Sequence, residues 1–208
     1  MTLTEIPCFK ESVNKLPEPL KANLSSQLEK IADNVSWPKS DQPESLQIVA
    51  SIPAVLSCSD FVVRVLQKHG GQFESVISPR LLNQYQSGEH IESLQSLCAD
   101  DADEVVVKRW LRQYRQIAMA VIAWRDLAGW ASLEETFLSL TELAQGSAQV
   151  ALKYASLWES ARFGEPRSPD GVLQKMMIIG MGKLGGGELN CSSDIDLIFF
   201  FPETGQTD

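Results

Sequence analysis

Two acidic side chains near the end of the sequence are the residues best suited to do chemistry. Asp194 and Asp196 are two positions apart, so on a β-strand both carboxylates leave the same face, with Cα atoms about 6.5 to 7 Å apart. Carboxylates placed in this way can hold divalent metal ions, which stabilise the attacking and leaving oxygens of a displacement at phosphorus. We therefore predict that Asp194 and Asp196 are catalytic, metal-binding residues and that Mg²⁺ is the metal.

A glycine-rich connector, GMGKLGGGELNCSSDIDL in residues 180–197, leads into these acids. Gly182, Gly185 and Gly186 have no Cβ atom, so the backbone can approach a phosphate closely. Amides that open a short helix there can point at the phosphate oxygens, and Lys183 adds a compact positive charge. The connector is not a Walker A motif, because its lysine precedes Gly185 instead of following it.

The same glycines are compatible with a dinucleotide-binding turn. Gly180, Gly182 and Gly185 have the required spacing, and Glu203 lies close to where a ribose-binding acid would fall. That fold, however, needs a crossover helix that returns the chain to a parallel second strand. Only nine residues separate Gly185 from Ile195, and glycine, asparagine and serine predominate among them, which disfavours a helix. The connector length therefore favours metal-dependent phosphate chemistry.

Two apolar segments flank the connector and are expected to position it. Residues 173–179 and 195–201 are short, mostly apolar runs, which is typical of buried β-strands. In the plainest alternative, Ser193 and Asp194 only cap a turn and Asp196 faces solvent on an edge strand. The combination of a glycine–lysine connector with two flanking strands favours the catalytic interpretation.

The chain before residue 165 is predicted to be helical. Prolines, including Pro53, are expected to divide the first quarter into short helices and loops. A compact helix follows, with Ser59 or Asp60 as its N-cap and Gly70 at its end. Apolar residues at intervals of three and four predict a long helix over residues 103–130.

A second long helix is expected to begin at Ser132. Its predicted buried face passes through Leu140, Ala144, Ala151 and Ala155, whose small size would let a neighbouring helix approach. On the preceding helix, the side opposite the apolar stripe carries a group of basic residues. We expect this group to be a solvated helix face, and a contact with phosphate or a partner is the alternative. Its members are Lys108, Arg109, Arg112 and Arg115.

The helical period ends in RFGEPRSPDG, residues 162–171, which contains two prolines and two glycines. We predict an α+β protein, in which an all-α helical region, residues 1–165, is followed by the first strands of a mixed β-sheet domain, residues 171–208. Two strands cannot complete a sheet with a closed active site. The second domain is therefore expected to be truncated.

The composition is that of an ordinary globular protein with an excess of acid. The 208 residues carry a formal net charge of −9, which argues against a non-specific nucleic-acid binder. The four cysteines, Cys8, Cys58, Cys98 and Cys191, form no C-x-x-C pair and are expected to be reduced. The N-terminus lacks the features of a signal peptide, and no window approaches the roughly 20 apolar residues of a membrane span. We expect a cytoplasmic protein that binds neither nucleic acid nor membrane.

A glycine turn followed about ten residues later by D-x-D resembles the nucleotidyltransferase superfamily. More closely, GMGKLGGGELNCSSDIDLIFF in residues 180–200 is similar to the N-terminal catalytic domain of the bifunctional glutamine synthetase adenylyltransferase/adenylyl-removing enzymes. LRQYRQIAMAVIAWRDLAG in residues 111–129 resembles the helical segment that precedes that domain. The resemblance implies that the β-sheet domain is of the nucleotidyltransferase type.

This family implies a chemistry. Its C-terminal catalytic domain transfers AMP from ATP to a tyrosine of glutamine synthetase, and its N-terminal catalytic domain removes AMP by phosphorolysis, releasing ADP. Because the catalytic stretch follows a helical region that starts at Met1, we expect the adenylyl-removing copy. By position, the resemblance assigns the metal to Asp194 and Asp196. It assigns the lining of the adenylyl phosphate and the attacking phosphate to Gly182, Lys183, Gly185, Gly186 and Ser193.

The family also implies partners: adenylylated glutamine synthetase, phosphate, ADP or ATP, and the PII signal protein in the full-length enzyme. The superfamily uses a third carboxylate on a later strand, and this sequence stops at Asp208 before such a strand. We therefore expect an N-terminal fragment that is inactive alone. Two alternatives stay open, namely a helical interaction module without catalysis and a nucleotidyltransferase that acts on another substrate.

Overall fold

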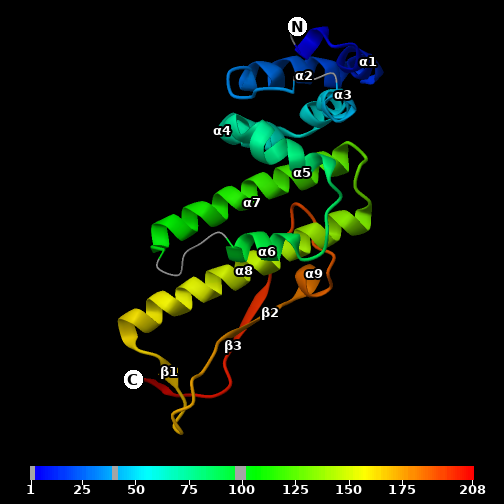
Figure 1. Cartoon of the computed structure of the whole chain (residues 1–208). Coiled ribbons are helices and arrows are strands. Elements are labelled where there is room, and N and C mark those ends of the chain that lie inside the picture. The colour runs from blue at the N-terminus through cyan, green and yellow to red at the C-terminus, as the bar shows by residue number, and fades with distance from the viewer. Residues whose placement is uncertain (1–2, 39–41, 97–101) are drawn as a thin grey trace. The chain divides into compact units, whose positions relative to one another are not determined.

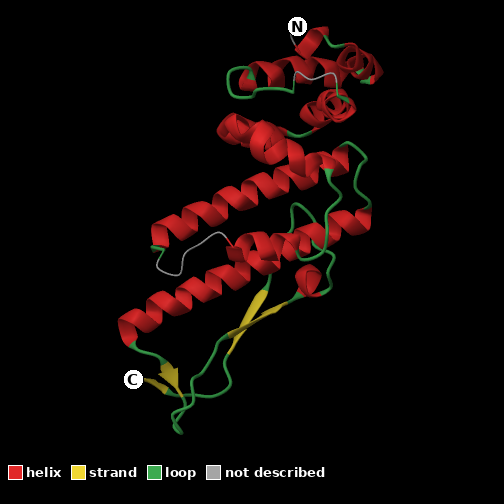
Figure 2. Ribbon diagram, viewed as in Figure 1, coloured by secondary structure: helices red, strands yellow, loops and turns green. Residues whose placement is uncertain are grey.

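The computed structural model describes residues 3–38, 42–96 and 102–208, and most of them are helical (Figure 1). The described strands all follow the last long helix (Figure 2). The longer helices are α1 (Pro7–Lys15), α2 (Glu18–Ile31), α3 (Pro43–Cys58), α4 (Asp60–His69), α6 (Glu89–Ser96), α7 (Glu104–Leu127) and α8 (Leu133–Phe163). The short helical elements are η1 (Leu3–Glu5), η2 (Gly70–Gln72), η3 (Phe73–Ile77), α5 (Ser78–Leu82) and α9 (Gly182–Gly185). The strands are β1 (Pro166–Arg167), β2 (Met177–Gly180), β3 (Leu197–Phe200) and β4 (Gln206–Thr207).

The chain packs as two compact units. Unit 1 comprises Met1–Tyr85 and Gln116–Leu133, and unit 2 comprises Gln86–Arg115 and Glu134–Asp208. The predicted change from helix to strand falls between the end of α8 and the start of β1, whereas both elements belong to unit 2. The arrangement is compatible with an α+β protein, and the division into domains 1–165 and 171–208 stays a prediction.

The core of unit 1 is built around α3. Its residues Ile48, Ile52 and Leu56 have no exposed surface, because they recur on one side of a helix that α1, α2 and α4 contact. Trp124 of α7 joins this core with 1% exposure. The Trp124 indole N–H donates to Ser51 Oγ over 2.8 Å, so its polar atom is satisfied inside the core.

Helix ends in unit 1 follow the predicted capping chemistry in part. Ser59 Oγ accepts a hydrogen bond from the Val62 amide over 3.2 Å and caps α4 as expected. Gly70 ends α4, but with a φ of −60°. A Cβ atom on Gly70 would lie 2.6 Å from the Asn34 carbonyl oxygen. Close approach of another backbone segment, and not a left-handed turn, therefore requires glycine at this position.

The expectation that Pro53 separates two elements is wrong. Pro53 is buried inside α3, which continues from Pro43 to Cys58. A proline in a helix loses one backbone hydrogen bond and costs about 3 kcal/mol. Burial of the apolar side chains on both sides of Pro53 outweighs that cost, because tertiary packing overrides local propensity.

In unit 2, α6 packs against α7 and α8 through polar contacts. The His90 Nδ1 atom lies 3.0 Å from the Tyr114 hydroxyl, and Nε2 lies 3.0 Å from Ser139 Oγ, so both ring nitrogens are bonded. The Glu142 carboxylate accepts hydrogen bonds from Ser87 Oγ over 2.7 Å and from the Gly88 amide over 2.6 Å. These contacts bury polar side chains, whose burial cannot be predicted from the spacing of apolar residues.

The buried face of α8 agrees with the predicted one at Leu140, which is buried, and differs from it further along the helix. Ala151 and Ala155 are exposed, whereas Gly146 is buried against α6. A Cβ atom on Gly146 would lie 2.9 Å from Leu94 Cδ1 and 3.3 Å from Ile91 Cα. The helix turns this glycine and its polar neighbours toward α6, so that Ala144 is half-buried and Ala151 and Ala155 are left at the surface.

The described strands form two antiparallel pairs. β1 pairs with β4, and β2 pairs with β3. In the second pair Met177 lies opposite Phe200 and Gly180 lies opposite Leu197. This antiparallel pairing rules out the parallel second strand of a dinucleotide-binding unit. The predicted strands are found, but each is shorter than expected.

The expectation that these strands are buried is wrong for the described chain. Ile179 and Ile198, which lie side by side on one face, are 49% and 48% exposed, and Phe199 on the other face is 58% exposed. A pair of strands needs further strands or helices to cover its faces. The hairpin formed by β2 and β3 therefore keeps much of its apolar surface open.

Two further expectations concern the whole chain. Among the described residues no single helix has the length and apolar content that a membrane crossing requires, and only the bent pair Pro43–Cys58 and Asp60–Leu82 meets those criteria together. Within the described part of the chain, Cys8, Cys58 and Cys191 form no disulfide bond. Cys98 lies outside the described residues.

Candidate phosphate site in the hairpin connector

The connector between β2 and β3 starts and ends at a shared backbone contact. The Met181 amide donates to the Asp196 carbonyl oxygen over 2.9 Å, one position beyond the strand ladder. Because β3 begins at Leu197, Asp194 and Asp196 precede the strand instead of lying on it. The alternation of side chains between the two faces of a strand therefore reaches Asp196 at most, at the edge of β3, and does not extend to Asp194.

The structure brings the first glycine of the turn next to the second carboxylate. Gly182 has a φ of +53°, in the left-handed region that glycine adopts without strain. A Cβ atom on Gly182 would lie 3.4 Å from Asp196 Oδ2. Residues fourteen positions apart thus meet at one spot, where the absence of a side chain leaves the carboxylate open to a ligand.

The next glycines pack the turn. Gly185 and Gly186 donate their amides to the carbonyl oxygens of Met181, over 3.1 Å, and Gly182, over 3.0 Å. A Cβ atom on Gly185 would lie 2.5 Å from the Gly180 carbonyl oxygen. These two amides close the single turn of α9, so any contact of Gly185 and Gly186 with a phosphate would come from their exposed Cα surface. Their predicted role stays a prediction.

A residue that the sequence analysis did not single out organises the end of the connector. Asn190 Oδ1 accepts hydrogen bonds from the Ser192 amide over 3.2 Å and from Ser193 Oγ over 2.6 Å. An Asx turn of this kind uses the side chain to hold its own following backbone. Ser193, a predicted phosphate-lining residue, is therefore held immediately before Asp194. The signal available in the sequence was an asparagine followed two and three positions later by serines.

The charged residues of the connector are open to solvent. Lys183, Asp194 and Asp196 are all exposed, whereas Leu184 and Leu189 are buried. Leu184 packs over Gly180, where an added Cβ atom would lie 2.9 Å from Leu184 Cγ. The connector thus turns two apolar side chains inward and leaves its lysine and carboxylates outward, as a ligand site requires.

These residues provide oxygen donors for a hard cation. Within residues 3–38, 42–96 and 102–208, no group of three or more histidine, cysteine, aspartate or glutamate side chains is gathered as a metal cluster. Mg²⁺ is commonly held by only one or two carboxylates, together with water and substrate phosphates. Asp194 and Asp196 are both exposed, and Asp196 lies beside the open Gly182, so the two carboxylates fit that donor set.

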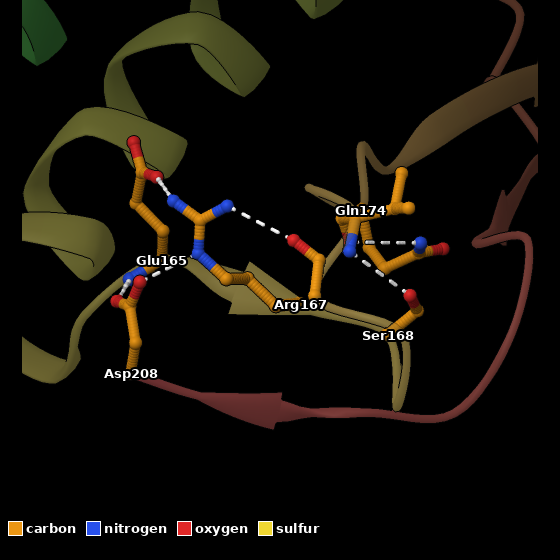
Figure 3. Close-up of polar contacts among 7 residues, drawn as sticks. Glu165, Arg167, Ser168, Gln174 and Asp208 are labelled. Carbon is orange, nitrogen blue, oxygen red and sulfur yellow. Dashed lines mark hydrogen bonds and ion pairs between the residues drawn. The ribbon is translucent and has the colours of Figure 1, made fainter.

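A second polar cluster lies where β1 pairs with β4 (Figure 3). The Arg167 guanidinium donates to Asp208 Oδ2 and to Glu165 Oε2, each over 2.6 Å. Its hydrogen bond with Arg167 lowers the pKa of the Asp208 carboxyl, and the bond from the Glu165 amide lowers it further. Ser168 Oγ accepts from the Val172 amide in the turn alongside. All three guanidinium nitrogens of Arg167 already donate to acceptors of this chain, so we interpret this cluster as structural.

Comparison with known proteins assigns the chain to a family. The family model described as glutamate-ammonia ligase adenylyltransferase matches residues 49–208. The chain belongs to this family, as the glycine–carboxylate stretch predicted.

Individual relatives carry a more particular name. A protein of Nitrosococcus oceani is 34% identical over 201 residues, which covers 96% of this chain and 21% of the relative. A protein of Shewanella woodyi is 40% identical over 153 residues, covering 74% of this chain and 16% of the relative. Both are named bifunctional glutamine synthetase adenylyltransferase/adenylyl-removing enzyme. The chain thus spans about a fifth of the length of these relatives.

Proposed function

We propose that the hairpin connector is part of a nucleotidyltransferase site that removes AMP from adenylylated glutamine synthetase by phosphorolysis. The observation that carries the proposal is the contact between the open Gly182 turn and Asp196 Oδ2, in a chain of the glutamate-ammonia ligase adenylyltransferase family. In this reaction a phosphate oxygen attacks the adenylyl phosphorus, the bond to the tyrosine oxygen breaks, and ADP leaves.

The residues of the connector divide the work. The two phosphates would lie along Lys183 and the open surface of Gly182, Gly185 and Gly186. A compact cation attracts phosphate oxygens, and backbone without side chains lets them come close. Ser193, held by Asn190, would lie beside them. A resident Mg²⁺, held by Asp194 and Asp196, would supply charge stabilisation on the phosphate oxygens.

The removal of AMP is preferred to its addition because of the order of the elements. A helical region up to Phe163 precedes the hairpin, as expected for the N-terminal catalytic domain of the family. ATP, the adenylylation of glutamine synthetase and the PII signal protein are proposed for the whole protein. We propose that this protein acts in the cytoplasm.

The proposal is tested in two proteins: the 208-residue chain itself, and a chimera in which it replaces the matching segment of the Nitrosococcus oceani relative. Phosphate-dependent release of ADP from adenylylated glutamine synthetase is the measurement. We expect Asp194→Asn in the chimera to reduce the rate by at least about 100-fold, because loss of a metal-binding carboxylate costs several kcal/mol of transition-state stabilisation.

A matched control is Glu188→Gln, which neutralises another exposed acid of the same connector. We expect its rate to stay within about threefold of the unmodified chimera, since a surface charge away from the chemistry contributes little. An Asp194→Asn chimera that releases ADP at the full rate would rule out the metal role. A chimera that adds AMP but shows no phosphate-dependent removal would overturn the assignment of removal to this site, because the addition is expected from the C-terminal domain of the relative.

A further inference from the structure

A basic face on α7 lies outside the glycine–carboxylate site. Lys108, Arg109, Arg112 and Arg115 fall within eight residues and are all exposed. They lie on the side of the helix opposite the buried stripe that includes Tyr114, as their spacing of three and four residues requires. All of them belong to unit 2. Four of the 18 basic residues of the chain are thus concentrated on two turns of one helix.

Among the residues that the structure describes, no acidic side chain neutralises the arginines of this basic face. Lys108 forms an ion pair with Glu104. In the described part of the chain, Arg109, Arg112 and Arg115 have neither an ion pair nor a hydrogen bond through their side chains. By contrast, Arg125 donates to the Leu81 carbonyl oxygen over 2.6 Å. Three neighbouring guanidinium groups could therefore each form a bidentate pair with a carboxylate.

The size and surroundings of the basic face favour a protein as its partner. From Arg109 to Arg115 the helix rises by only about 9 Å, which matches a short acidic segment. A nucleic acid extends its charge much further, so the 27 acidic residues of the chain would repel it. Val105 and Val106, 64% and 47% exposed, border the arginines. Apolar side chains beside arginine are typical of protein–protein interfaces, whereas phosphate backbones offer them no partner.

We propose that the basic face of α7 docks an acidic surface segment of the protein substrate. The identity of the partner rests on the proposed function. The connector can hold the phosphates and the modified residue, but recognition of a whole protein needs a second contact away from the chemistry. Charged groups at such a contact set the association rate and the choice of partner more than they set the reaction itself.

The test measures binding of adenylylated glutamine synthetase to the immobilised 208-residue chain at several salt concentrations. The variant R109E/R112E/R115E is compared with K10E/K15E/R64E, which reverses three exposed cations on α1 and α4 and changes the net charge equally. We expect the α7 variant to bind at least about tenfold more weakly and with a flatter salt dependence. The control variant should stay within about twofold.

Folding is checked by circular dichroism, and R109Q/R112Q/R115Q replaces the reversal if that variant does not fold. Equal weakening in the α7 and control variants would overturn the proposal, because it would indicate a general charge effect. Unchanged binding in the α7 variant, or no binding by the unmodified chain, would overturn it as well. So would tighter binding of polyuridylate that is lost in the α7 variant. The proposed function is judged separately, by ADP release from the Asp194→Asn chimera.

Discussion

The core of unit 1 and the β2–β3 hairpin both contain large apolar side chains, which are buried in unit 1 and exposed in the hairpin. Trp124 is 1% exposed inside unit 1, whereas Phe199 in the hairpin is 58% exposed. Around Trp124 several helices supply side chains on all sides. Among the described residues, each strand of the hairpin pairs with one other strand. The segment proposed to do chemistry is therefore held mainly by local backbone contacts, whereas the helices of unit 1 are held by a packed interior.

The largest expected effect comes from removing the indole that the unit 1 core surrounds. Trp124→Ala should lower the free energy of unfolding by about 3–5 kcal/mol, because it leaves a cavity and removes the hydrogen bond to Ser51. Phe199→Ala, a matched truncation of an exposed aromatic, should cost less than about 1 kcal/mol. Urea denaturation followed by tryptophan fluorescence and circular dichroism measures both changes. Similar losses would show that the hairpin is packed as tightly as the core.

The backbone path of the connector could be predicted in part, because the length of the connector leaves few options. Nine residues between Gly185 and Ile195 cannot form a crossover helix, and the observed antiparallel pairing follows. The capping of α4 by Ser59 was likewise predictable, since it depends on residues only three positions apart. Local constraints of this kind act within one stretch of sequence.

Other features depend on partners distant in the sequence and could not be predicted. The buried face of α8 is set by α6 and the residues just before it. His90 of α6 bonds to Ser139, and Ser87, before α6, bonds to Glu142. The close approach of α6 also requires glycine at position 146. A pattern of apolar residues marks none of these positions. The start of β3 at Leu197 likewise depends on the backbone contact between Met181 and Asp196. The exposure of the predicted buried strands reflects how many layers cover them, which composition does not reveal.

A smaller and local effect is expected in the connector. Gly185→Ala would place a Cβ atom 2.5 Å from the Gly180 carbonyl oxygen, so the turn must open, at a cost of about 1–3 kcal/mol to the hairpin. The amides of Met181 and Gly186 should then exchange with solvent faster, while those of α3 keep their protection. Hydrogen exchange followed by NMR measures both regions in one sample.

Gly186→Ala is the matched control for the connector. The nearest atom to its added Cβ is Glu188 Oε1 at 3.4 Å, at the flexible end of a side chain that can move aside. We expect little change in exchange for this variant. If Gly185→Ala also left the exchange rates unchanged, the turn would not depend on the close approach at Gly180. If Gly185→Ala also accelerated the exchange of the α3 amides, the hairpin and the helical core would unfold together. The two regions would then not be held independently.

The smallest effect concerns the ion pair that ties β1 to the residue after β4. The bond from Arg167 lowers the pKa of the Asp208 carboxyl. A lowered pKa means that the contact is fully present above the ordinary pKa of aspartate and is lost as the pH falls through the lowered value. An NMR titration of the Asp208 side-chain carboxyl should show this shift, and Arg167→Gln should move the pKa back up toward its ordinary value. An unshifted carboxyl in the unmodified chain would show that the strand pairing alone holds this end of unit 2.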